Sequence, residues 1–186
     1  MAIAENNSAH VGIGAAGKVY IAPAGTTVPT TASGTLDNAF QNVGYISDAG
    51  VVISETGDSQ DIGSWGGQVV KTIKTTFKEV AKFTPIQVDA TVIQAMYADV
   101  TVNTANGVTT ITAKHNNADL PPVVVVIDCL PNDITKTRYI ATNAQLTTRG
   151  DASLTGTAVQ GRELEYTCNP GADGTTITSI TEITEA

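Results

Sequence analysis

The sequence predicts a mainly β protein with antiparallel strands and a single helix. Thr, Val and Ile make up 64 of the 186 residues, and β-branched side chains suit a pleated surface better than a helix. The segment from Gln68 to Phe83 alternates apolar and polar residues, a period of two that is typical of an antiparallel strand with one buried face. Apolar residues at helical spacing follow Thr84 and indicate one helix.

The charge of the chain limits its partners. Charged residues are 15% of the sequence and the formal net charge is −8, which argues against disorder driven by charge, a coiled coil, or a nucleic-acid-binding protein that neutralises phosphates. The longest apolar run, Pro121 to Ile127, has the length of a strand, so we expect no membrane partner. Residues 1–16 contain no basic residue, and we expect no signal peptide.

The first half of the chain is predicted to contain short strands and one long loop. Residues 54–67 contain four glycines and three acids without a base, and loops of this length without structure of their own are usually functional or disordered. The other predicted elements are an arm at 1–16, strands at 18–22, 43–46 and 51–53, a turn at 48–50, and a strand region at 68–83 that is either one strand or two joined by a bend.

A helix is predicted from Pro85 to Ala98. Thr84 can serve as the N-cap and Pro85 suits the first helical position, while Gln87 can complete a capping box. The residues Ile86, Ala90, Ile93 and Tyr97 form an apolar stripe that is predicted to pack on the sheet.

Strand signals continue through the second half of the chain. Asn106-Gly107 separates two β-type runs at 100–102 and 108–113, which predicts a tight hairpin. The apolar run 123–129 suits a strand that is buried on both faces. Further strands are predicted at 137–147, 160–168 and 175–180. We expect a single β domain at 17–174 and a C-terminal tail at 175–186.

Several short motifs are explained better by structure than by chemistry. Residues 12–17 match G-x-G-x-x-G, but no strand precedes them and no helix follows, so a dinucleotide site is not expected. Arg149-Gly150-Asp151 is interpreted as a turn. No Ser, His or Cys constellation with catalytic or metal-ligand spacing is present, and we therefore predict no enzymatic activity, no cofactor and no metal. With no export signal, Cys129 and Cys168 are predicted to be reduced thiols.

The loop at 54–67 contains the candidate binding residues. Trp65 is the only tryptophan and lies between glycines. A lone tryptophan is most often a core residue, whereas one on a glycine-flanked loop is typical of an anchor for a partner surface. Glu55, Asp58 and Asp61 could bind calcium, but the ligand order of an EF-hand is absent, and a solvated acidic loop is the simpler interpretation.

Five segments in this order resemble the major tail proteins of long, non-contractile-tailed bacteriophages. They cover most of residues 17–174 and are GKVYIAPAGT at 17–26, the residues around FQNVGYIS at 36–51, WGG at 65–67, LTTRGDASL at 146–154 and EYT at 165–167. The resemblance implies a tail-tube-like fold of two packed antiparallel β-sheets, a sandwich or partial barrel, with one flanking α-helix.

The resemblance also implies a structural role in the virion tail. Six copies would form a ring, and rings would stack around the tape measure protein into a tube that genome DNA later crosses without specific binding. Assembly would take place in the host cytoplasm, with tail-end proteins as further partners. The candidates for contacts between subunits or rings are then Glu55, Asp58, Asp61 and Trp65. The alternative is another β-rich assembly subunit, pilin-like or capsid-decorating.

Overall fold

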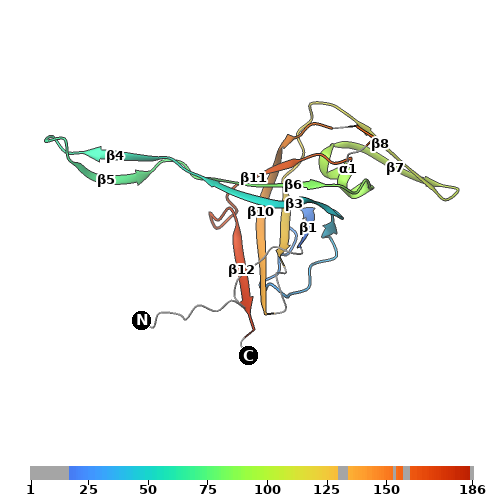
Figure 1. Cartoon of the computed structure of the whole chain (residues 1–186), viewed down its shortest axis with the longest axis horizontal. Helices are drawn as coiled ribbons and strands as arrows, with labels where there is room; N and C mark the ends of the chain where they lie inside the picture. The colour runs from blue at the N-terminus through green and yellow to red at the C-terminus, as the bar shows by residue number, and fades with distance from the viewer. Residues whose placement is uncertain (1–16, 130–133, 153, 157–159, 185–186) are drawn as a thin grey trace.

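A computed structural model describes residues 17–129, 134–152, 154–156 and 160–184. Among them are one eight-stranded antiparallel sheet, two separate two-stranded hairpins and one helix, α1 (Ala90–Met96) (Figure 1). The mainly β fold with one helix is thus confirmed, and the predicted arm at 1–16 lies outside the described residues. The strands are β1 (Gly17–Pro23), β2 (Gln41–Asn42), β3 (Ile46–Thr56), β4 (Ser59–Gly63), β5 (Val69–Lys74), β6 (Lys78–Pro85), β7 (Asp99–Ala105), β8 (Val108–Lys114), β9 (Val123–Cys129), β10 (Thr135–Arg149), β11 (Leu164–Cys168) and β12 (Thr178–Ile183).

The main sheet divides into two parts at β10. Its strand order is β2-β1-β9-β10-β11-β6-β3, with β12 also paired to β10. The first half of β10 pairs with β12 over residues 135–140, and its second half pairs with β11 over residues 144–149. The pairing of β10 with β9 shifts register between Ala141 and Ala144, and such irregularities bend a strand. One long strand therefore belongs to both parts of the sheet.

The core lies on both faces of β9. One cluster joins the two parts of the sheet and α1, and within it the rings of Phe83 and Tyr166 stack with centroids 5.7 Å apart. The other cluster contains Val124 and Val126 of β9, and loop residues such as Leu36 and Phe40 pack against it. This arrangement confirms the prediction that the apolar run 123–129 is buried on both faces. Because β9 has no wet face, it has no polar alternation.

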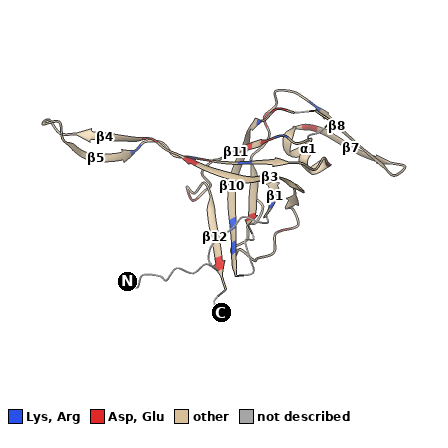
Figure 2. Ribbon diagram, in the orientation of Figure 1, with Lys and Arg blue, Asp and Glu red and all other residues tan. Residues whose placement is uncertain are grey.

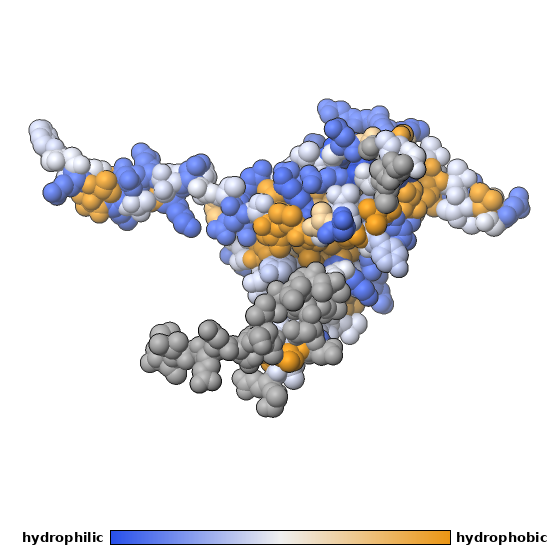
Figure 3. Space-filling model, viewed as in Figure 1, coloured by the Kyte–Doolittle hydropathy of each residue, from blue (hydrophilic) through white to orange (hydrophobic). Residues whose placement is uncertain are grey.

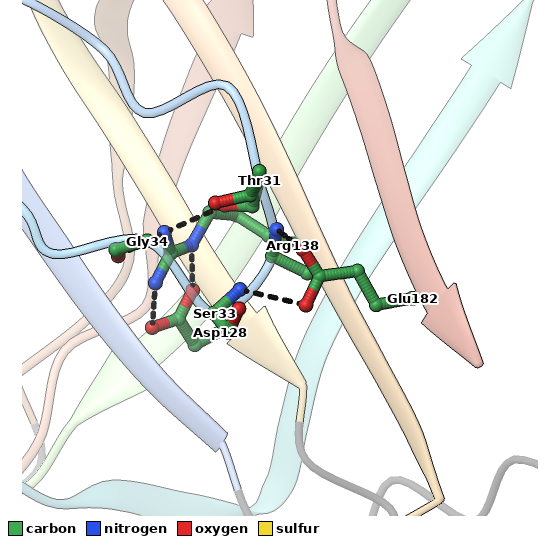
Figure 4. Close-up of polar contacts among 7 residues, drawn as sticks. Thr31, Ser33, Gly34, Asp128, Arg138 and Glu182 are labelled. Atoms are coloured by element: carbon green, nitrogen blue, oxygen red, sulfur yellow. Dashed lines mark hydrogen bonds and ion pairs between the residues drawn. The ribbon is translucent and has the colours of Figure 1, made fainter. Parts of the chain in front are cut away.

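A buried ion pair holds the loop that covers the second face of β9. The Arg138 guanidinium donates two hydrogen bonds to the Asp128 carboxylate, 2.5 and 2.9 Å long (Figure 4). The same guanidinium donates to the carbonyls of Thr31 and Gly34, and the Glu182 carboxylate of β12 accepts from two backbone amides between them. The loop is therefore anchored by strands β9, β10 and β12 together.

The helix is shorter than predicted and begins later. It spans Ala90–Met96 with Asp89 as the N-cap, whose carboxylate accepts from the Val92 amide at 2.9 Å. The predicted cap at Thr84 is wrong, because Thr84 and Pro85 belong to β6 and Pro85 lies opposite Ile46 of β3. Sheet pairing at the end of β6 outweighs the local capping signal.

The strand predictions near the N-terminus need one correction. Residues 46–56 form a single strand, β3, whose register shifts between Ile46 and Val51 where it passes Gly50. The predicted strand at 51–53 lies within β3 and is confirmed. The separate strand at 43–46 and the turn at 48–50 are wrong, because residues 43–45 lie outside any strand and residues 48–50 belong to β3. The region 68–83 forms two strands, β5 and β6, which is one of the two arrangements considered.

The hairpin at Asn106-Gly107 is confirmed. Both residues have positive φ, 51° and 77°, as a two-residue type I′ hairpin turn requires. At the other end of the chain, β12 pairs with β10 in the main sheet, so residues 178–183 of the segment predicted as a tail form a strand of that sheet.

We expect Arg138→Met to lower the free energy of unfolding by about 3–5 kcal/mol, because it leaves the Asp128 carboxylate buried without its partner. Arg138→Met combined with Asp128→Leu should recover much of this loss, since no unpaired charge then remains. Urea denaturation of the three proteins measures the effect. A double variant less stable than Arg138→Met would contradict the explanation.

Both cysteines are free, and Cys168 should make stability depend on alkaline pH. Burial, with a smaller effect of the Glu79 charge, raises the pKa of Cys168 from 9.0 to about 11. The unfolded chain loses this proton at lower pH than the folded chain, so the free energy of unfolding should fall between pH 9 and pH 11. Cys168→Ala should make the decline shallower in denaturation curves recorded across this range, and an unchanged slope would refute the assignment.

Candidate assembly interface

The hairpin of β4 and β5 projects from the body of the protein as an arm (Figure 1). It continues the paired strands β3 and β6, which belong to the edge of the main sheet. All five residues of β4 are exposed. From here on, "arm" means residues 57–77, which include both strands and the turn between them, and not the N-terminal arm predicted at 1–16.

Threonine hydroxyls and aspartates connect the two strands of the arm. At its base, the Asp58 carboxylate accepts from the Thr76 hydroxyl at 3.0 Å, and the Asp58 amide donates back to that hydroxyl. Further out, the Asp61 carboxylate accepts from the Thr72 hydroxyl at 2.6 Å. A side chain at Gly57 would come within 2.9 Å of the Thr76 carbonyl oxygen, so glycine permits the close approach of the strands there.

The tip of the arm presents apolar side chains to solvent. Trp65 is fully exposed, at 106% of its reference area, and lies in a turn closed by a 2.7 Å hydrogen bond from the Ser64 amide to the Gln68 carbonyl. Ile62, Val69 and Val70 are exposed beside it, and the arm shows an apolar patch in the space-filling view (Figure 3). Large exposed apolar patches mark sites of interaction.

The structure brings three of the four predicted site residues together on the arm. Asp58, Asp61 and Trp65 lie there, whereas Glu55 lies in β3 directly opposite Glu79 of β6. The predicted loop at 54–67 is wrong in its secondary structure, because residues 59–63 form β4 and pair with β5. Within the described residues, no group of acids, histidines or cysteines is arranged to hold a metal ion.

The hairpin of β7 and β8 is a second projection. The cross-strand pairs Val100–Ala113 and Val102–Ile111 share one face, while the pairs Thr101–Thr112 and Asn103–Thr110 share the other. Val102 and Val108 are exposed. A two-stranded hairpin is marginally stable alone, and this one carries an apolar face that its own chain covers only in part.

The main sheet also has an edge that its own chain leaves open. Among the described residues, β3 pairs on one side only, with β6 and not with a further strand. Open edges present unpaired amides and carbonyls that can accept another strand. The edge strand β3 leads directly into the arm.

One lysine of the region 68–83 forms an ion pair, and another lies near an aromatic ring. Lys82 lies opposite Glu165 in the sheet, and its ammonium is 2.9 Å from that carboxylate. The hydrogen bond from Lys82 and the charge of Glu165 raise the pKa of Lys82. Lys74 lies 6.0 Å from the centre of the Phe77 ring. Figure 2 shows that acidic and basic residues are few and interspersed on the ribbon.

A small apolar pocket lies beside α1, which the sequence did not predict. Its volume is about 150 Å³, and its apolar lining includes Val88, Val92, Ile93, Met96 and Leu154. Val88 and Leu154 remain 63% and 77% exposed at the pocket. Sequence patterning could not reveal it, because the two segments that form it are about sixty residues apart in the chain.

These features define a class: a β-sheet subunit with an open edge and projecting hairpins, built to assemble with other chains. No helix in the described part of the chain has the length and apolar character needed to cross a membrane. The sequence profile of the phage tail tube protein family matches residues 3–184, so this chain belongs to that family and is a structural component of a virion tail. No curated protein matches the chain.

Proposed function

We propose that six copies of this chain form a ring and that rings stack into a hollow tube through which genome DNA passes. The observation that carries the proposal is the arm: a hairpin that stands clear of the body and exposes Ile62, Trp65 and Val70. Burial of these side chains against another subunit would remove their apolar surface from water, which is favourable. Membership of the tail tube family supports a tube as the assembly.

In the proposed ring, neighbouring subunits are joined by pairing between the edges of their sheets. The open edge of β3 offers backbone groups to a strand of the next copy. When such a contact is head-to-tail and closes on itself, it generates a ring without free edges. The arm then extends beyond the body, and we assign it to contacts with the next subunit or ring.

The proposed partners follow from a tube. The tape measure protein would occupy the lumen during assembly in the host cytoplasm, and tail-end proteins would close the tube. The role is structural rather than catalytic. Burial of more than about 1,000 Å² per contact, as a stable specific interface needs, fits an edge and an arm acting together.

Purified protein at high concentration should form rings or tubes in negative-stain micrographs. Trp65→Ala should fold normally, because Trp65 touches little of its own chain and such surface substitutions change stability by about 0.5 kcal/mol or less. It should nevertheless need a higher concentration to assemble, since its exposed indole is lost from the arm. Ile183→Ala, at an exposed apolar residue of β12 outside the arm, the β3 edge and both hairpins, is the matched control. Monomers at all concentrations and salt conditions would refute the tube.

Assembled tubes should bind duplex DNA only weakly. Six copies at −8 each carry a formal charge of −48, and the Lys82–Glu165 pair offsets one of the lysines that could attract phosphates. Affinity from phosphate contacts is steeply salt-dependent, so binding should be negligible near physiological salt, where exposed charges are screened within ~8 Å. Sub-micromolar binding in a filter or anisotropy assay would contradict this expectation.

A further inference from the structure

The tip of the arm is suited to insertion into an apolar site. Residues 63–70 carry no charge, so burial of the tip would bury no ion. The turn is already formed, with hydrogen bonds from the Ser64 amide to Gln68 and from the Gly67 amide to Ser64. Because the backbone at Trp65 is preorganised, docking the indole would cost less entropy than ordering a free loop.

The pocket beside α1 matches an aromatic side chain in size and chemistry. An apolar cavity of about 150 Å³ accommodates a benzene-sized group, so one ring of an indole would fill it and the other would lie at its mouth. Arg162 lines the pocket, and its guanidinium is fixed by hydrogen bonds to the Gly150 carbonyl (2.8 Å) and the Tyr97 hydroxyl (2.6 Å). A fixed guanidinium offers a flat cationic surface to an aromatic ring.

We propose that Trp65 of one subunit inserts into the α1 pocket of a second copy, an inference that rests on the proposed assembly function. The arm projects from one side of the body, whereas α1 lies on the other side, at the base of the β7–β8 hairpin (Figure 1). The segment from Thr56 to Trp65, which includes β4, spans at most about 30 Å, at about 3.3 Å per extended residue, and it points away from α1. The indole of one molecule therefore meets the pocket of another.

The geometry makes the contact heterologous. Each subunit contributes an arm on one side of its body and a pocket on the other, so each copy has two neighbours of this kind. Head-to-tail contacts of this type close into rings or continue as filaments, and both outcomes agree with a tube. Trp65 would be the central anchor of the contact, with Val69, Val70 and Leu154 around it.

Disulfide trapping tests the contact with Trp65 intact. In a Cys129→Ala background, one protein carries Gly66→Cys, where a Cβ would meet only the Ser64 hydroxyl, at an ordinary 3.9 Å. A second protein, distinguishable by mass, carries Val88→Cys at the exposed pocket residue. Mild oxidation of the mixture should give the mixed disulfide in roughly tenfold excess over a mixture with Val108→Cys, since the bond needs Cβ atoms about 4 Å apart. Adding Trp65→Ala to the Gly66→Cys protein should abolish that excess. Circular dichroism confirms that each variant folds.

The outcomes separate this contact from the tube itself. Rings or tubes of the unmodified protein without specific trapping would overturn the pocket contact and leave the proposed function standing. Specific trapping without rings or tubes would support the contact and overturn the proposed tube, and failure of both would overturn both. Trapping that persists after Trp65→Ala would also refute the role of the indole.

Fluorescence of the unmodified protein gives an independent test, because Trp65 is the only tryptophan. Its emission should shift to shorter wavelength on assembly and become several-fold less sensitive to iodide. Leu154→Arg, which places a charge at the pocket, should prevent the shift, whereas Ala172→Arg in the exposed turn between β11 and β12 should not. Emission that stays sensitive to iodide in assembled wild-type protein, or a shift that survives Leu154→Arg, would contradict the proposal.

Discussion

The buried pair of Arg138 and Asp128 is the constraint on which the rest of the fold depends. These residues lie opposite each other on β10 and β9, and both are almost fully buried. Each charge needs the other, because an unpaired buried charge is far costlier than a paired one. Arg138 has further donors, and these fix the loop carbonyls of Thr31 and Gly34. The loop that contains Thr31 and Gly34 thereby covers the second core cluster. As a result, β9 is buried on both faces.

Burial of β9 on both faces explains why the outer elements remain open. The chain has one short helix among its described residues, so the sheet has few other elements to cover it. Loop 24–40 and β12 cover one face of β9, while the curvature at β10 brings β6 and β11 toward the other. Within the described chain, the backbone edge of β3, the arm and part of the β7–β8 hairpin remain uncovered. Because the covering elements pack on the central strand β9, the exposed apolar surface lies at the edges of the sheet.

The sequence predicted the parts of the fold whose signals are local. The run at 123–129 is almost entirely apolar, and Asn-Gly is a turn signal by itself. Both elements could therefore be predicted without knowledge of tertiary contacts. The arm was missed because β4 has exposed residues on both faces, so no alternation identifies it, and its glycines resemble a loop. The helix start at Thr84 failed because sheet pairing of Pro85 with Ile46 is a contact across about forty residues. The pocket beside α1 depends on tertiary placement and has no sequence pattern.

The composition of the arm fits the proposed contact with another subunit. A two-stranded hairpin in water is marginally stable, and here the Asp58–Thr76 and Asp61–Thr72 hydrogen bonds connect its strands without an apolar core. These bonds set the register and leave Ile62, Trp65 and Val70 free to contact a partner. A core within the arm would have consumed those side chains, and a charged tip would have opposed their burial. The arm therefore has the residues that connect its strands and its proposed binding surface on different side chains.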